Sequence, residues 1–157
     1  MRGDGALAGS VWDEVLDTRH VVVVRTYVER WPRNSGPPEK VLIIVVEPDE
    51  GHRCRCPRCG RRGRAVETDV RRWRTLDVHG KRCFLESQLP RITCPEHGKI
   101  TAAVPWARHG DRFSMPFEDH AAWLAAHTAW TRASRQLRIT WEALAGIVAR
   151  VAEAFGL

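Results

Sequence analysis

The chain has 157 residues, 43% hydrophobic and 28% charged, with 25 Lys and Arg against 19 Asp and Glu and a net charge of +6. The length suits one medium domain or two small ones, and this apolar fraction is too high for wholesale disorder. No apolar run approaches the ~18 residues of a membrane helix, and the N-terminus lacks the pattern of a secretory signal. We therefore expect a soluble, cytoplasmic protein without a membrane partner.

The positive charge is concentrated in the middle third of the chain. Residues 1–52 carry a net charge of −3, residues 53–112 a net charge of +9, and residues 113–157 none. Thirteen of the fifteen cations in the middle third are arginines, whose planar fork suits phosphate oxygens and guanine edges. This pattern favours a nucleic-acid partner over the alternative of a merely well-solvated surface.

The first third predicts two strands. Segments 20–29 and 41–47 are short and rich in β-branched residues, and the stretch between them, 32–38, has the composition of a loop. Two antiparallel strands joined by that loop are the simplest account. We assign residues 1–50 to an N-terminal β-hairpin segment.

The middle third predicts a small β domain. Segments 71–78 and 81–89 flank a His79-Gly80 pair, which is a hairpin signal. Short strands, a hairpin and all five cysteines are the components of a zinc ribbon, which we assign to residues 51–105.

Residues 113–157 predict three helices. Ser114 can cap the first, Thr131 a short second helix over 132–137, and Thr140 a third that runs from Trp141 to about residue 155. The apolar positions of the third helix follow the spacing of a face directed at a core: Leu144, Ile147, Val148, Val151 and Phe155. The predicted fold is therefore α+β, with a three-helix C-terminal unit.

The strongest motif is a pair of knuckles, Cys56-Pro-Arg-Cys59 and Cys94-Pro-Glu-His97, each followed by glycine. Three thiolates and one imidazole fill a tetrahedral zinc site and leave no position for water, so the metal would be structural. His52 or Cys54 could replace His97 as the fourth ligand. Cys83, in a predicted strand, fits a small core residue better than a ligand.

The C-terminal segment predicts a helix-turn-helix, with residues 138–140 as the turn and the helix from Trp141 as the recognition helix. Arg138 stands where glycine is common, so the turn is atypical. The residues of this unit that we expect to contact DNA are Arg138, Thr140, Trp141, Glu142, Ala145 and Arg150. The alternative is a plain three-helix bundle whose third helix only packs.

A second set of DNA contacts is expected from the arginine-rich strand. Arg71, Arg72 and Arg74 surround Trp73, and alternation along the strand would bury the tryptophan and turn the arginines outward. The same side chains could instead stack on and contact a nucleic acid directly.

No catalytic motif is present. The chain has no His-x-Glu before Cys56, no P-loop, no Gly-x-Ser-x-Gly and no paired-histidine zincin motif, and its carboxylates are scattered. We therefore expect no enzymatic activity from this chain.

The order of these motifs resembles the N-terminal part of ISL-three (ISL3) family insertion-sequence transposases. The resemblance covers about residues 50–155 and includes the stretches 94–98, 104–109, 117–119 and 147–150. It implies that the ribbon and the helix-turn-helix bind the terminal inverted repeats of the element as double-stranded DNA. It also implies zinc on Cys56, Cys59, Cys94 and His97, and a recognition helix within 140–150.

In that family, a DDE domain of RNase-H-like fold follows and cuts and joins DNA. Its carboxylates do not carry over, because this sequence stops at Leu157. We expect a DNA-binding module without strand cleavage. The alternatives are a truncated regulator, which would compete or associate with intact transposase or with itself, and a zinc-stabilised protein-interaction domain.

Overall fold

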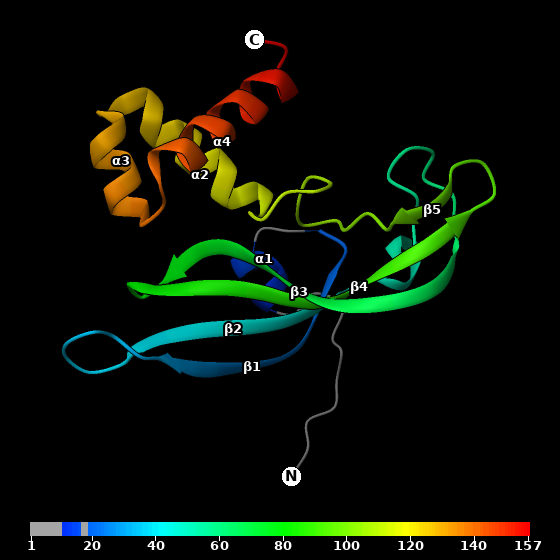
Figure 1. Ribbon diagram of the computed structural model, residues 1–157, viewed down its shortest axis with the longest axis horizontal. Coiled ribbons are helices and arrows are strands. Elements are labelled where there is room, and N and C mark those ends of the chain that lie inside the picture. The colour runs from blue at the N-terminus through cyan, green and yellow to red at the C-terminus, as the bar shows by residue number, and fades with distance from the viewer. Residues whose placement is uncertain (1–10, 17–18) are drawn as a thin grey trace. The chain divides into compact units, whose positions relative to one another are not determined.

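The computed structural model describes residues 11–16 and 19–157 and divides the chain into two compact units, with the boundary after Ser114 (Figure 1). The first unit is built on a β-sheet and the second is helical, which confirms the α+β class. Within the described residues, no helix is long and apolar enough to cross a membrane.

The first unit contains a five-stranded sheet in the order β1-β2-β4-β3, with β5 paired to β4. All neighbours are antiparallel except β2 and β4, which run parallel. The strands are β1 (Val21–Trp31), β2 (Glu39–Pro48), β3 (Arg64–Val78), β4 (Lys81–Cys94) and β5 (Gly98–Thr101).

Both predicted hairpins are present. β1 pairs with β2 from Val21↔Pro48 to Trp31↔Glu39. β3 and β4 turn at His79 and Gly80, whose φ angles of 51° and 74° are the positive values that a two-residue type I′ turn needs.

Strands β3 and β4 are longer than the sequence predicts, and β5 is additional. The first half of β3, residues 64–71, is exposed throughout, so it lacks the apolar alternation by which a strand is recognised. It is extended because it pairs with β4 as far as Arg64↔Thr93.

The hairpin segment and the ribbon segment share one sheet, where the sequence suggested two separate units divided near residue 50. β2 pairs with β4 from Leu42↔Cys83 to Val45↔Glu86. The physical reason is the burial of β2 side chains on both faces of the sheet. A strand of this kind is stable in a central position, where it pairs with a neighbour on each side.

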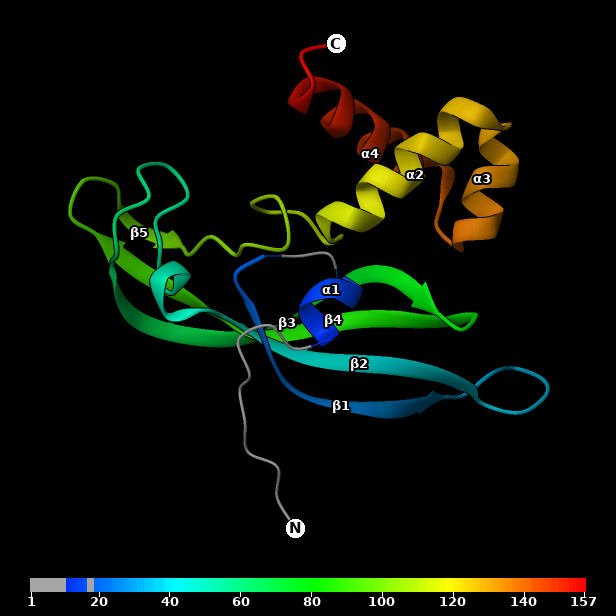
Figure 2. The ribbon, with the colours of Figure 1, turned by 180° about the vertical axis from the view of Figure 1, so that it is seen from behind.

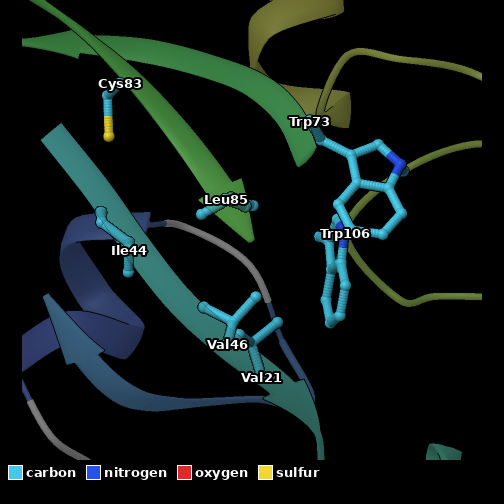
Figure 3. Packing of buried hydrophobic residues seen from close by; sticks show 8 residues of the cluster. Val21, Ile44, Val46, Trp73, Cys83, Leu85 and Trp106 are labelled. Carbon is cyan, nitrogen blue, oxygen red and sulfur yellow. The ribbon is translucent and has the colours of Figure 1, made fainter. Parts of the chain in front are cut away.

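The main core lies on one face of this sheet and is organised around two tryptophans (Figure 3). Trp73 and Trp106 meet edge to face with ring centroids 5.3 Å apart. Cys83 is fully buried in this core beside Leu85, as expected. Burial raises the pKa of its thiol to about 12.

A short helix that the sequence did not indicate, α1 (Val11–Leu16), lies beside the sheet in both ribbon views (Figures 1 and 2). It packs Trp12 and Leu16 against the core.

The opposite face of the sheet carries ion pairs that tie strands together. Arg72 of β3 donates to Glu29 of β1 and, through Nε at 2.9 Å, to Glu86 of β4. Arg82 of β4 donates to both carboxylate oxygens of Glu39 on β2 at 2.7 Å. Because both arginines are only partly exposed, these pairs are less screened than ordinary surface pairs.

Replacement of Glu29 by glutamine should weaken the acid sensitivity of folding. Hydrogen bonds from Arg72 and Trp31 lower the Glu29 pKa from 4.5 to about 2. The stability that this ionised group contributes is therefore complete above about pH 4.5 and is lost as the pH falls towards 2. Urea midpoints measured across pH 2–7 should fall less steeply for Glu29→Gln than for the unmodified chain. Glu67→Gln, which alters an exposed pair with Arg91, is the control and should follow the unmodified curve.

The second unit consists of α2 (Met115–His127), α3 (Trp130–Leu137) and α4 (Trp141–Ala154). Leu144, Ile147 and Val151 of α4 are buried, as their spacing predicts. Phe155 was expected to continue this face, but it lies just past the helix end and is 71% exposed.

The capping predictions for α3 and α4 differ in outcome. The Thr140 hydroxyl accepts the Ala143 N–H at 3.1 Å, which confirms it as the cap of α4. Thr131 does not cap α3, because that helix already begins at Trp130. The Trp130 indole donates to the Ala125 carbonyl at 3.0 Å, which holds this residue in place at the helix start.

Candidate metal centre and nucleic-acid interface

The first knuckle is a tight turn between Cys56 and Cys59. The Cys56 N–H donates to the Arg61 carbonyl at 2.8 Å, and the Gly60 N–H donates to the Cys56 carbonyl at 2.9 Å. Gly60 has a φ of 73°, a value that glycine adopts without strain. The two thiols therefore face the same point.

The second knuckle joins β4 to β5. Cys94 is the last residue of β4 and pairs with Gly98, the first residue of β5. The intervening turn places His97 next to Cys94 in space, so the sheet itself positions this pair of ligands.

The structure brings Cys56, Cys59, Cys94 and His97 together as one cluster. His97 Nδ1 lies 3.6 Å from Cys56 Sγ and 3.7 Å from Cys94 Sγ, and the Cys59 and Cys94 sulfurs are 3.5 Å apart. Around a tetrahedral zinc ion, two sulfurs stand about 3.8 Å apart and a sulfur and a nitrogen about 3.6 Å apart. The cluster therefore has the donor set and the dimensions of a structural zinc site.

Backbone amides favour the thiolate form at two of these cysteines. Burial alone would raise the pKa of Cys56, but hydrogen bonds from the Cys59 and Arg58 backbones lower it overall. At Cys94, hydrogen bonds from the backbones of Glu96 and His97 outweigh burial and lower the pKa. At Cys59, a backbone hydrogen bond from Arg61 acts against burial and the neighbouring sulfurs, which together raise its pKa.

The two knuckles are packed against each other without space to spare. Cys56 and Cys94 form a small buried cluster with Ile92 and Ala102. At Gly63, an added Cβ would come within 2.8 Å of the Thr93 carbonyl oxygen, so a side chain does not fit there. The ligands therefore sit on a closely fixed frame.

The two alternative fourth ligands lie outside this cluster. The His52 imidazole contacts Asp49, with Nδ1 2.6 Å from the carboxylate. Cys54 packs against the small buried cluster as a partly buried side chain, but its sulfur is not among the grouped ligand atoms. The geometry thus favours His97.

Substitution of a ligand should abolish the thiolate–metal signal. We expect Cys94→Ser to lose most of the thiolate-to-cobalt charge-transfer absorption in the cobalt-substituted protein, because one of the sulfur ligands is removed and the frame loosens. Cys54→Ser is the matched control and should keep the full absorption. If Cys54→Ser instead lost the absorption and Cys94→Ser kept it, the assignment of ligands would be wrong.

The turn before α4 has the form of a C-terminal helix cap. Arg138 adopts φ 56° and ψ 44°, and its N–H and that of Ile139 return to carbonyls of α3 at Arg135 and Ser134. Glycine is the residue that usually occupies such a left-handed position, so the presence of Arg138 makes the turn atypical in the sequence.

The exposed start of α4 contains most of the expected DNA contacts of this unit. Arg138, Thr140, Trp141 and Glu142 are exposed, and Ala145 is half-buried on the next turn. In a helix-turn-helix, the N-terminal residues of the second helix are those that reach base edges. Two further exposed arginines on α3, Arg132 and Arg135, were not singled out from the sequence, although their i, i+3 spacing puts them on one helix face.

Arg150, one of the expected DNA contacts, forms an ion pair inside the second unit. Its guanidinium lies 2.7 Å from the carboxylate of Glu118, which is fully buried in α2. The pair joins α2 to α4 inside the second unit, and contact of Arg150 with DNA stays a prediction. Burial of Glu118 could not be predicted from the sequence, since charged residues are rarely interior unless paired.

The arginines around Trp73 also separate into different roles. Arg71 is exposed, whereas Arg72 is held by Glu29 and Glu86. Arg74 is only 6% exposed and donates to Asp77 at 2.8 Å. The three arginines thus differ in burial and in their ion pairs, and their contact with DNA stays a prediction.

Removal of the Arg150 cation should destabilise the helical unit. We expect Arg150→Met to lower the free energy of unfolding by about 2 kcal/mol, because it leaves the buried Glu118 carboxylate without this counter-charge. The double variant Glu118→Gln with Arg150→Met should recover most of the loss. Urea denaturation followed by circular dichroism measures both, and equal losses for the two variants would contradict the role of the pair.

A double-knuckle metal cluster followed by a helix-turn-helix defines a zinc-ribbon and helix-turn-helix protein, and comparison with known proteins supports both parts. Residues 52–97 match the family model for the zinc-finger of transposase IS204/IS1001/IS1096/IS1165. Residues 102–152 match the helix-turn-helix domain of transposase family ISL3. The chain belongs to this transposase family and corresponds to the N-terminal region of its members.

Two curated relatives are transposases for insertion sequence element IS1557 from Mycobacterium tuberculosis, strains CDC 1551 / Oshkosh and ATCC 25618 / H37Rv. Each is 40% identical over 112 residues, which is 70% of this chain and 25% of the relative. The chain thus spans about a quarter of the length of the curated relatives it matches. No solved structure matches it significantly.

Proposed function

We propose that this chain is the zinc-dependent DNA-binding module of an ISL3-family transposase and that it recognises the terminal inverted repeats of an insertion sequence. The observation that carries the proposal is the exposed, capped N-terminus of α4 in a segment that matches the family's helix-turn-helix model. The ligand cluster, in a segment that matches the family's zinc-finger model, supports the metal dependence.

In this proposal, α4 enters the major groove with its first turn. Thr140 and Glu142 offer hydrogen-bonding groups to base edges, and the Ala145 methyl suits contact with a thymine methyl group. We propose that Arg138, at the turn, contacts a phosphate. The positive end of the α4 dipole favours the same phosphate backbone.

The ribbon would contribute affinity more than sequence reading. Zinc, held by Cys56, Cys59, Cys94 and His97, would have four protein ligands and therefore a structural role. The exposed arginines of the first unit that we propose for phosphate contacts lie on or next to the ribbon strands: Arg61, Arg64, Arg71 and Arg91. Phosphate contacts of this kind weaken steeply as salt rises.

The same surface would serve a regulator that competes with an intact transposase. The proposal assigns DNA binding to the two segments that match the family's zinc-finger and helix-turn-helix models. Inhibition of transposition when this chain is supplied in trans would identify the regulatory use.

The primary test is binding to duplexes from the ends of the chain's own element, with scrambled duplex as the control, across a salt series. We expect preference for the element ends and loss of that preference when a chelator removes zinc. Equal, weak binding to both duplexes would contradict recognition of the repeats and favour a zinc-stabilised protein-interaction domain.

Replacement of Arg138 by glycine should separate DNA affinity from stability. The variant should raise the free energy of unfolding by about 0.5–1 kcal/mol, because glycine adopts the left-handed conformation without strain. It should weaken DNA binding and reduce the slope of log K against log salt by about 1 if one phosphate contact is lost.

Arg33→Ala is the charge-matched control, since Arg33 is exposed in the loop between β1 and β2. It should bind DNA as the unmodified chain does. Unchanged salt dependence in Arg138→Gly would remove Arg138 from the proposed interface.

A further inference from the structure

A second cluster of metal-ligating side chains lies at one end of the β1–β2 hairpin, outside the ribbon cluster. One carboxylate, Asp49, contacts two imidazoles: His20 Nδ1 at 2.9 Å from one oxygen and His52 Nδ1 at 2.6 Å from the other. The two rings stack with centroids 3.7 Å apart and an interplanar angle of 22°. The Nδ1 atoms of both histidines are therefore directed at the same carboxylate.

The backbone fixes all three residues. His20 immediately precedes β1 and Asp49 immediately follows β2, and the Asp49 N–H donates to the His20 carbonyl at 2.8 Å. A single 3₁₀ turn, Glu50–His52, brings His52 back over Asp49, with its N–H 3.0 Å from the Asp49 carbonyl oxygen. His20 has a φ of 68°, so its imidazole is held there by an uncommon backbone conformation.

Three arginines hold the loop from outside. Arg53 donates to the Pro48 carbonyl at 3.2 Å, Arg55 to the Gly51 carbonyl at 2.8 Å, and Arg62 to the Glu50 carbonyl. The shape of the loop is thus fixed without any ligand, and such preorganisation lowers the cost of binding one.

We propose that His20, Asp49 and His52 form a second site for a divalent transition metal such as Zn²⁺. Two imidazoles and one carboxylate are a common ligand set for such ions. A nitrogen and an oxygen bound to one metal at about 2.1 Å are about 3.0–3.4 Å apart, so the present contacts need to widen by less than about 1 Å. A metal bound at Nδ1 requires the imidazole tautomer that carries its proton on Nε2.

This site differs in kind from the ribbon cluster. It has three protein ligands, and their side chains are between 37% and 49% exposed, so water completes the coordination and the metal exchanges with solvent. The bound metal would join the residue before β1 and the residue after β2 to the turn that leads into the first knuckle. It would therefore stiffen the entry to the ribbon without being a ligand within it.

The test is the zinc content of the full chain after equilibrium dialysis at a fixed excess of free zinc, measured by atomic emission. We expect about two zinc ions per chain in the unmodified protein and about one in His20→Gln and in His52→Gln. His109→Gln, which alters an exposed histidine elsewhere in the same unit, is the matched control and should keep two. Circular dichroism before and after dialysis checks that each variant is folded.

One zinc ion in the unmodified chain, or two in every variant, would overturn the proposal. Failure of the ribbon site is detected separately, because only that site has thiolates and gives thiolate-to-cobalt absorption. A variant that keeps this absorption and loses one metal has lost the His20–Asp49–His52 site. If the chain never shows the absorption, the ribbon assignment is contradicted. The second site is then tested by the zinc that is lost in His20→Gln and His52→Gln.

Discussion

Strand β4 is the constraint on which the first unit depends. It pairs with β3 along most of its length, with β2 over Leu42↔Cys83 to Val45↔Glu86, and with β5 at its end. It also contributes Cys83 and Leu85 to the core and ends at Cys94. The position of the second knuckle is therefore set by the same backbone that organises the core, and a shift of one residue in the β4 register would move ligands and core side chains together.

The arginines of this chain show why counts of charge overstate an interaction surface. The middle third has a large excess of cations, yet Arg72, Arg74 and Arg82 form ion pairs with carboxylates from other strands or from the same hairpin. Arg53, Arg55 and Arg62 donate to backbone carbonyls of one loop. The exposed guanidiniums are therefore fewer than the charge count indicates, and in the first unit the sheet decides where they lie.

Local signals in the sequence predicted the parts of the structure that depend on few residues. The His79-Gly80 turn, the Thr140 cap and the close spacing within each knuckle all act over four residues or fewer, and the structure has each of them. The parallel pairing of β2 with β4 and the contact between Arg150 and Glu118 join residues that are more than thirty positions apart. Such pairings leave no periodic trace in the sequence, so the ion pairs of Arg72 with Glu29 and of Arg150 with Glu118 could not be predicted from it.

The continuity of β3 and β4 gives the first unit a built-in length scale. At about 3.3 Å per residue, the 14 residues of β4 extend up to about 46 Å from the His79-Gly80 turn to Cys94. B-form DNA advances about 3.4 Å per base pair, so the hairpin is about as long as 13 base pairs. This length is a little more than one helical turn of B-form DNA, which takes about 10.5 base pairs.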